Sequence, residues 1–386
     1  MKSSWVILLI TLGFLHLPFS ILKGQDPLFS QFHISKAYSN PAMTGTDGTI
    51  SLSSIVREQW GAIDQFRQFP GAFSTQFASA EFAQSQLKNA FGFFFMRDAE
   101  GDGMLETQMF GLNYAYVLPF EAKHSLHNIR LGLGLFYNEK SIDWDKLLFS
   151  DQLDARGPEF FAAQSAHAQY FNEFSMNAPK WVEINPGIVY RLNQKSYRGK
   201  GSQLELGLSF SHLMTLFTRT QQESLQGIAT ESNNKIIVHG AAFIPGLQLG
   251  KKGKKFTPFP AFRYEQQSQI NTLTVGSRFM FMNLGTSIFY QNTVSDRIAY
   301  STDAIIVGFD LSWPIGKGQI IETGFSYDLN INGLNPTSGG TMEISVKYQY
   351  LDSRKAGKVV CPSVNRAHSD RYENIWHKTI HRKHMN

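Results

Sequence analysis

A short acidic segment, residues 97–103, is the part of this sequence that most resembles a chemical site. Its carboxylates stand at every second position and glycines interrupt them, as at the start of a calcium-binding loop. The twelfth position of such a loop needs a glutamate that chelates the ion, but the residue there is Met109. The segment therefore favours an ordinary acidic loop over calcium binding.

Histidines near the end of the chain are a second candidate, for a metal site. His377 and His381 could share one face of a helix and bind a metal ion, with His384 nearby and Cys361 upstream. They lie in a basic stretch of sequence, which favours a solvated tail. We therefore expect no metal ion here.

No catalytic motif appears in a convincing sequence context. The sequence offers no paired-carboxylate motif, nucleophile elbow or phosphate-binding loop. A hydrolase would need serine and histidine on neighbouring strands, and His212 and His239 are only weak candidates for that histidine. We therefore predict a protein that is not an enzyme and has no cofactor.

The N-terminus predicts export. Lys2 provides a positive start, an uncharged apolar run follows at residues 5–17, and Gly24 is a small residue at a plausible cleavage point. The run is shorter than the ~20 apolar residues of a membrane-spanning helix. Residues 1–24 are thus predicted to be a Sec signal peptide.

The composition of the rest favours a chain that alternates between lipid and water. Charged residues make up only 17% of the sequence and aromatic residues 13%, with 32 phenylalanines and 32 glycines. The single cysteine cannot form an internal disulfide. The mature chain contains no apolar run long enough for a membrane helix, and we expect no nucleic-acid partner.

Alternation with a period of two is the dominant pattern along the chain. Between residues 128 and 138, apolar side chains fall on one face and Arg130, several glycines and Asn138 fall mainly on the other. The same alternation elsewhere predicts fourteen strands of mostly 8–12 residues, which begin near Ile50, Ala72, Ala90, Thr107, Asn128, Trp181, Gln203, Lys235, Phe256, Ile270, Leu284, Ala304, Gln319 and Thr341. Ten tilted residues cover roughly 25 Å, the apolar band of an outer membrane.

These strands predict an all-β fold, a transmembrane antiparallel β-barrel of about fourteen strands. The alternatives are a large β-sandwich and a propeller, for which shorter strands and a repeated blade motif are typical. With an even strand count, both ends lie in the periplasm. Most connections agree with short periplasmic turns and longer extracellular loops: long ones at residues 60–71, 139–180, 214–234 and 292–303, short ones at 282–283 and 314–318. The connection at 266–269 is an exception, because it is short although it would face outward.

Charged residues on the polar faces of the strands are predicted to point inward. They could pair across the lumen and solvate it, or they could line a polar conduit or seat a plug. They are Arg57, Arg130, Glu183, Arg191, Glu205, Arg263, Arg278, Asp310, Glu322, Asp328, Glu343 and Lys347.

The tail at residues 351–386 is basic. It holds eight Lys/Arg against three Asp/Glu, a net of +5 that equals the formal charge of the whole chain. In the periplasm it could meet an acidic partner, lipid headgroups or peptidoglycan, or it could be a solvated tail.

Several blocks of sequence, in this order, resemble the PorP/SprF family. The opening Gln25–Phe32 run (QDPLFSQF), the NPAMTG block at residues 40–45 and the REQW block at residues 57–60 are similar to its N-terminal signature. Segments at residues 142–154 and 207–213, the NPTSGG block at 335–340 with Glu343, and Cys361-Pro362 are similar to later ones. Two features depart from the family pattern. Val56 stands where the family usually has an aromatic residue before the arginine, and residues 363–386 extend beyond the point where family members usually end.

This resemblance implies an outer-membrane barrel of a Gram-negative bacterium that serves type IX secretion and gliding by binding. Expected partners are outer-membrane lipid, secretion components and an adhesin-like cargo, with periplasmic ring or peptidoglycan-anchor proteins as further candidates through the basic tail. The resemblance assigns the family-motif residues Asp26, Pro27, Phe29, Ser30, Gln31, Asn40, Pro41, Gly45, Arg57, Gln59, Trp60, Asn335, Pro336, Ser338, Gly339 and Gly340.

The sequence thus divides into a signal peptide (1–24), an N-terminal periplasmic segment or plug (25–48), the barrel (49–350) and the tail (351–386). We expect the irregular second part to fold under or into the periplasmic mouth. The leading function is a secretion or adhesin-anchoring scaffold. The alternative is an outer-membrane channel for a small or hydrophobic solute.

Overall fold

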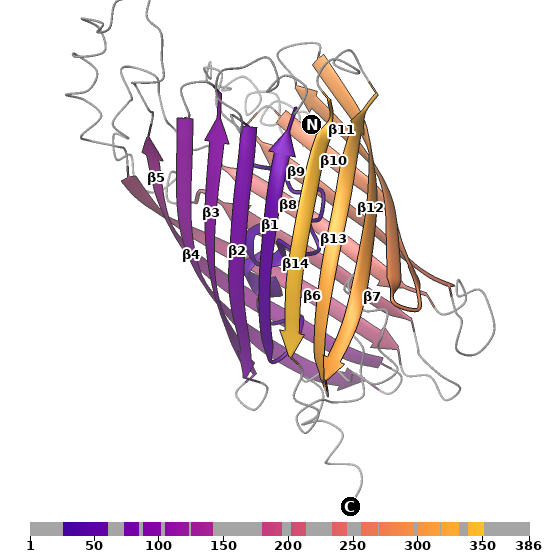
Figure 1. Cartoon of the computed structure of the whole chain (residues 1–386). Helices are drawn as coiled ribbons and strands as arrows, with labels where there is room; N and C mark the ends of the chain where they lie inside the picture. Colours follow the sequence, from indigo (N-terminus) through magenta and orange to yellow (C-terminus); the bar gives the residue numbers. More distant parts are fainter. Residues whose placement is uncertain are drawn as a thin grey trace, which may run out of the picture.

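A computed structural model gives the fold of the chain (Figure 1). The structure describes residues 26–60, 73–84, 88–101, 105–122, 125–141, 180–194, 202–213, 234–244, 256–268, 270–295, 300–316, 318–331 and 339–350. The predicted signal peptide, the motif segment at residues 142–154, the end of the acidic segment at 102–103, and the tail with Cys361 and its histidines lie outside these residues. The family-motif residues Asn335, Pro336 and Ser338 do so too.

Fourteen antiparallel strands close into a barrel, which confirms the predicted fold class. The strands are β1 (Ile50–Gln59), β2 (Phe73–Gln84), β3 (Asn89–Glu100), β4 (Leu105–Ala122), β5 (Ser125–Ser141), β6 (Lys180–Gln194), β7 (Gln203–Ser211), β8 (Lys235–Phe243), β9 (Phe256–Gln267), β10 (Ile270–Phe281), β11 (Leu284–Ser295), β12 (Tyr300–Gly316), β13 (Gln319–Asn330) and β14 (Thr341–Tyr350). β1 pairs with β14 from Ile50↔Tyr350 to Gln59↔Thr341, so the sheet has no free edge.

Four strands are longer than the sequence pattern predicts. β4 has 18 residues, β5 and β12 have 17 each, and β6 has 15. Apolar alternation is a signal of contact with lipid, so it ends where the apolar band ends. Backbone pairing continues past that band, because polar side chains there are solvated on both faces.

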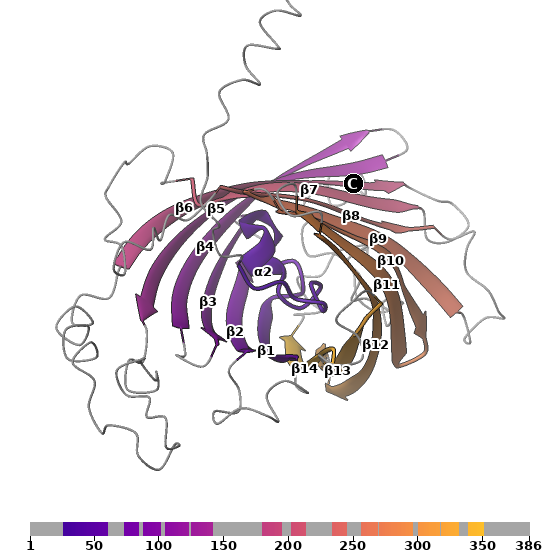
Figure 2. The same cartoon turned by 90° about the horizontal axis from the view of Figure 1, so that it is seen from above.

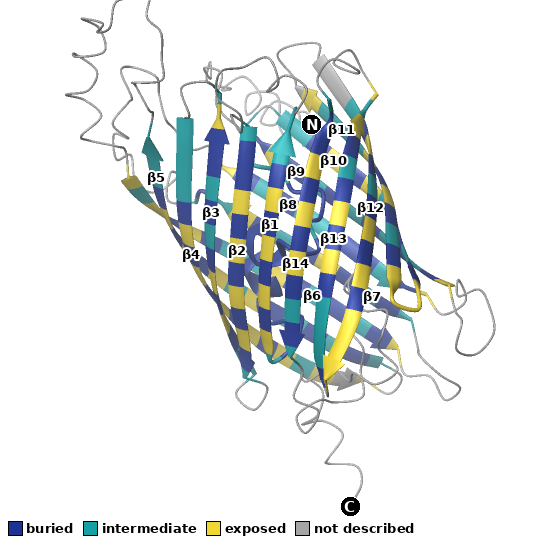
Figure 3. Ribbon diagram, viewed as in Figure 1, coloured by how far each residue is buried: buried dark blue, intermediate teal, exposed yellow. Residues whose placement is uncertain are grey.

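Along each strand, buried and exposed side chains alternate (Figure 3). The outward side chains include Leu112, Leu133 and Ile288, which are about half exposed and suit a lipid surface. Every charged residue that the pattern turned inward is buried. Within the described ranges, the helices are all too short or too polar to traverse a bilayer.

Residues 26–48 lie inside the barrel, and we call them the luminal segment (Figure 2). The segment contains one helical turn, α2 (Lys36–Ser39), and one turn of 3₁₀ helix, η1 (Pro41–Met43). Asn40 caps η1 by accepting a hydrogen bond from the Ala42 N–H at 3.0 Å, and proline at the first helical position needs no donor. Such short turns cannot stand alone, so the barrel wall must hold them.

Candidate functional site

The luminal segment runs from one mouth of the barrel to the other. At the mouth where β1 begins and β14 ends (the lower mouth, as Figure 1 is drawn), Thr49 N–H donates to the Tyr350 carbonyl at 2.8 Å. At the opposite, upper mouth, Asp26 contacts His212, Lys235 and Gln267, which lie at the upper ends of β7, β8 and β9. The segment therefore extends well beyond a single mouth, which is further than the sequence suggested.

Glu343 of β14 is the acceptor that holds the upper part of the luminal segment. Its two carboxylate oxygens accept the backbone N–H groups of Ser30 and Gln31, at 2.7 and 2.8 Å. Arg57 of β1 donates to the same carboxylate at 2.6 Å. Hydrogen bonds to an ionised acceptor are stronger than neutral ones, and this carboxylate is fully buried. We call Glu343, Arg57 and the two N–H groups the latch.

The side chains next to the latch fix the register of the segment against the wall. Ser30 Oγ donates to Asp328 at 2.5 Å, and the Ser345 hydroxyl donates to Gln31 Oε1 at 2.6 Å. Gly324 lies against Gln31, where a Cβ would overlap the side-chain oxygen. The serine and glutamine of the opening motif are therefore positioned by β13 and β14.

Asn40 and Pro41 pack against glycines of two central strands. A Cβ at Gly132 of β5 would overlap the backbone of Ala42, and one at Gly187 of β6 would overlap the Asn40 amide. The Asn40 Nδ2 group donates to the carbonyls of Ile188 and Leu208, at 3.4 and 3.3 Å. These glycines allow the turn to approach the wall closely.

Polar side chains of the wall satisfy the carbonyls of the irregular turn. Arg130 donates to the Ala42 carbonyl at 2.7 Å and also to that of Thr44. Asn113 donates to the Ala37 carbonyl at 2.8 Å. Because a buried carbonyl without a donor is costly, these contacts allow non-helical backbone to lie in the lumen.

Gly45 is a position where only glycine fits. Its φ is +71°, its N–H donates to Glu81 at 2.6 Å, and a Cβ would lie 2.5 Å from the Ala90 Cβ.

We expect Gly45→Ala to destabilise the barrel by about 2 kcal/mol or more, because a left-handed backbone penalty adds to a steric overlap. Denaturant unfolding in micelles measures the change. Gly101→Ala is the matched control, since its φ is +75° and its Cβ would meet open space. Equal losses in the two variants would contradict the expectation.

An aromatic cluster also holds the luminal segment against the barrel wall. Phe29 packs on Phe77 with ring centroids 5.6 Å apart, and Tyr38 packs edge-on against Phe94 at 5.8 Å. Phe136 completes the contact with Phe94 at 4.8 Å. All these side chains are buried, and an aromatic pair contributes about 0.5–1.5 kcal/mol beyond burial.

Lower in the lumen, Asp47 of the segment lies between two lysines. It forms ion pairs with Lys36 of α2 and with Lys347 of β14. All three side chains are buried, so each charge depends on the others. The Lys36–Asp47 pair therefore lies within the luminal segment, whereas the Lys347–Asp47 pair joins the segment to the barrel wall.

One group of side chains has the composition of a metal site. Ligand atoms of His33, Asp310 and Glu322 all lie within 4.8 Å of one another. Arg278, however, already binds both carboxylates, with Nε 3.0 Å from Asp310 and Nη2 2.6 Å from Glu322. A cation would have to displace this guanidinium, so the group fits an ion-pair cluster better than a metal centre.

His212 lies just past the end of β7, between two carboxylates. Its Nε2 is 2.9 Å from Asp26 and its Nδ1 is 2.7 Å from Glu183. Burial disfavours the imidazolium, but the two carboxylates outweigh burial and raise the pKa of His212 to about 10.

The charge on His212 should make stability depend on pH. Its pKa is raised above the ordinary 6.5, so the stabilisation is complete below 6.5 and is lost as pH rises through about 10. We expect His212→Gln to be less stable than the native chain at neutral pH, and the gap to shrink above about pH 10. Thermal unfolding across this range tests it, and a gap that does not change with pH would contradict it.

At the upper rim, the REQW block meets the closing hairpin. Trp60 N–H donates to the Gly340 carbonyl at 2.8 Å, and Gln59 pairs with Thr341 in the β1–β14 ladder. Tyr327 donates to the Gly339 carbonyl at 2.8 Å. Two blocks far apart in sequence therefore close the barrel seam together.

The family model for type IX secretion system membrane protein PorP/SprF matches residues 21–348. The chain belongs to the PorP/SprF family. The match confirms the resemblance that the sequence blocks indicated, and it identifies an outer-membrane barrel of type IX secretion.

Among solved structures, the chain is similar to the CymD monoaromatic hydrocarbon channel, at 10% identity over 86% of this chain and 95% of that one, with a TM-score of 0.37. A Pseudomonas aeruginosa FadL homologue is similar at 10% identity over 82% and 94%, also with a TM-score of 0.37. The β domain of the Bordetella autotransporter BrkA is similar at 8% identity over 78% and 98%, with a TM-score of 0.29. No curated protein matches the chain.

The PorP/SprF motif residues that the structure describes lie in the luminal segment or at the seam between β1 and β14. Ser30 and Gln31 donate to Glu343 in the latch, Arg57 donates to Ser30, and Phe29 packs on Phe77. Asn40, Pro41 and Gly45 contact the wall lower down. Asp26 and Pro27 lie at the upper end, and Gln59, Trp60, Gly339 and Gly340 lie at the rim. The sequence alone placed Glu343 in the closing family block but did not show that it contacts the opening motif. Of Arg130 only the alternation was visible.

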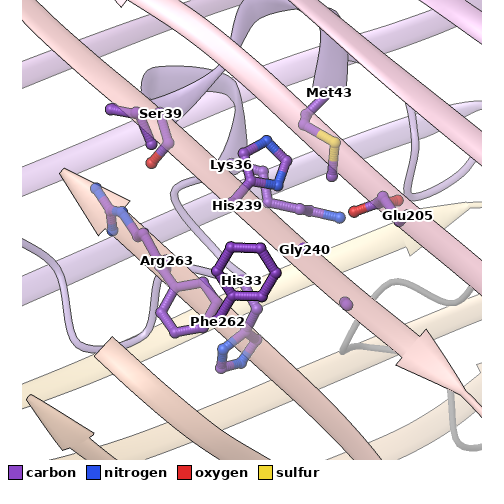
Figure 4. Close-up of a pocket in the computed structure, with 12 residues that line it drawn as sticks. His33, Lys36, Ser39, Met43, Glu205, His239, Gly240, Phe262 and Arg263 are labelled. Carbon is purple, nitrogen blue, oxygen red and sulfur yellow. The ribbon is translucent and has the colours of Figure 1, made fainter. Parts of the chain in front are cut away.

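The two histidines considered for catalysis have structural roles. His212 is held by the carboxylates described above, and His239 contacts the Asn40 amide at 3.1 Å. His239 also lines a small cavity of about 40 Å³ beside Lys36 and Glu205, large enough for little more than water (Figure 4).

Proposed function

We propose that this protein is a non-catalytic outer-membrane component of the type IX secretion and gliding machinery that supports export or surface attachment of a secreted protein such as an adhesin. The observation that carries the proposal is the use of the family motif. The motif residues that the structure describes hold the luminal segment or close the barrel seam, and the segment occupies the lumen. A filled barrel supports a binding scaffold over an open conduit.

We further propose that the upper mouth faces the outside of the cell. The long connections at residues 60–72, 142–179 and 212–234 follow β1, β5 and β7 at that mouth, while the short ones at 282–283 and 317–318 lie at the lower mouth. The connection predicted as long at residues 292–303 is only 296–299, because β11 and β12 extend further than their apolar alternation. Long outer loops and short periplasmic turns are the rule in bacterial outer-membrane barrels. The basic tail after β14 then enters the periplasm, where ring or peptidoglycan-anchor proteins are candidate partners.

This orientation predicts that the two ends of the mature chain lie on opposite sides of the membrane. Asp26 is at the upper mouth, whereas Tyr350 ends β14 at the lower one. We expect an epitope inserted before Asp26, after the signal peptide, to bind antibody on intact cells. An epitope after residue 386 should bind only in permeabilised cells. An N-terminal epitope that needs permeabilisation would contradict the orientation.

Deletion of the gene, with quantitative mass spectrometry of surface and secreted proteins, tests the proposed function. Loss of one large adhesin would identify a dedicated partner, and loss of the whole type IX cargo set would identify core machinery. An unchanged secretome would overturn the proposal and favour the channel for a small or hydrophobic solute.

A further inference from the structure

A cavity of about 470 Å³ lies at the upper end of the lumen, and we call it the upper vestibule. Its floor is the start of the luminal segment, Asp26 to Leu28, and its wall comes from the upper ends of strands on both sides of the seam, including β1, β3 and β13. Its volume is within the range of sites that bind small ligands.

Most of the charged side chains that line the upper vestibule are acidic. Asp26, Asp98, Glu100, Glu265 and Asp328 line it, and Arg57 is the basic residue among its described lining. Three of these carboxylates form ion pairs: Asp26 with His212 and Lys235, Glu265 with Arg263, and Asp328 with Arg57, which it shares with Glu343.

Asp98 and Glu100 of β3 are different. In the part of the chain that the structure describes, neither forms an ion pair, and their sequence neighbour Arg97 pairs with Glu106. Asp98 is only 7% exposed; its carboxyl group accepts a hydrogen bond from the Thr75 hydroxyl at 2.6 Å and lies within hydrogen-bond distance of the Glu100 carboxyl group. Two adjacent carboxyl groups that form no ion pair repel each other when both are charged, and a cationic ligand would offset that cost.

A second carboxylate, on the other side of the seam, also has an oxygen that can accept a hydrogen bond. Asp328 is 5% exposed, and among the described residues its Oδ1 atom has no hydrogen-bond partner, although Oδ2 accepts from Ser30. The cavity therefore has acceptor atoms on two walls rather than in one cluster.

The spacing of these acceptors favours an extended cation over a metal ion. The group of three possible metal ligands found among the described residues is His33 with Asp310 and Glu322, lower in the lumen, so no three vestibule carboxylates described by the structure bring ligand atoms within 4.8 Å of one another. Trp60 and Phe73, whose ring centroids are 5.1 Å apart, also line the cavity and offer aromatic surface to a cation.

We propose that the upper vestibule binds a lysine- or arginine-containing stretch of an extended peptide, with Asp98 and Glu100 as its main anionic contacts. This inference rests on the proposed function, because it supplies a contact through which a secreted protein is held at the outer mouth. Electrostatic contacts of this kind weaken as salt concentration rises.

Binding of a fluorescent pentalysine peptide to the purified full-length protein in micelles tests the proposal. We expect saturable binding at low salt and an affinity about tenfold or more weaker in the Asp98→Asn, Glu100→Gln double variant. Glu139→Gln is the matched control, because Glu139 is an acidic residue at the upper end of β5 that pairs with Lys180 and does not line the vestibule. Heat-dependent gel mobility confirms that each variant is folded.

Three outcomes would overturn the site. They are no binding of pentalysine to the native protein, equal weakening by the control variant, and equal binding of a pentapeptide of acetylated lysines. Calcium binding that is sensitive to the double variant, without peptide binding, would replace the peptide site with a metal site. The assay uses purified protein, so its failure is separate from the outcome of the gene deletion.

Discussion

Replacing Glu343 by alanine should destabilise the folded barrel by about 3–5 kcal/mol, the usual cost of removing one partner of a buried ion pair. The change leaves the buried Arg57 guanidinium without its 2.6 Å carboxylate and the N–H groups of Ser30 and Gln31 without their acceptor. Denaturant unfolding in micelles measures the loss. Limited proteolysis of residues 26–48 should accelerate in parallel, because the latch no longer holds the segment.

The control for this experiment is an ion pair at the surface. Glu139→Gln breaks the pair with Lys180, which is 3.3 Å long and partly exposed, and such pairs contribute at most about 1 kcal/mol. A native-like unfolding midpoint for Glu343→Ala would show that the latch does not stabilise the fold. An unchanged rate of proteolysis of residues 26–48 would show that the latch is not needed to keep the segment in the lumen.

Deleting residues 26–48 should convert a closed barrel into a conducting one. The segment lies inside the ring of strands, and the side chains it covers include the charged Arg57, Arg130 and Lys347. A lumen lined by such groups fills with water and passes ions once nothing occupies it. We expect conductance in planar bilayers to rise by about tenfold or more over the native protein.

A second variant keeps this expectation testable if the deleted barrel does not insert. Gln31→Pro retains the whole segment but removes one of the two N–H donors to Glu343, and it should give intermittent openings. A native protein that already conducts as strongly as the deletion would contradict the idea of a filled lumen. That result would favour the channel for a small solute.

The sequence by itself predicted the number of strands, and the structure begins each strand within four residues of its predicted start. The physical reason is that a strand between lipid and a polar interior must alternate at every residue, which is a local signal. The same alternation predicted which charges point inward, and all of them are buried. It could not predict where a strand ends outside the apolar band, as β4 shows.

The sequence blocks also identified the residues that matter for the luminal segment without showing what they contact. Ser30 and Glu343 are separated by most of the chain, and their contact exists only because β14 closes against β1. Nothing local to the opening motif indicates that its two N–H groups bind one carboxylate, or that Gly132 and Gly187 leave room for Asn40 and Pro41.

The direction of the luminal segment depended on the tertiary structure alone. The irregular composition of residues 25–48 predicted a segment at or in a mouth, but only contacts with the ends of β7, β8 and β9 bring Asp26 to the upper end. Periodicity reports which face of a strand a side chain takes. It carries no information on how far a chain of turns travels through a closed lumen, because that distance is decided by contacts with strands that fold elsewhere in the sequence.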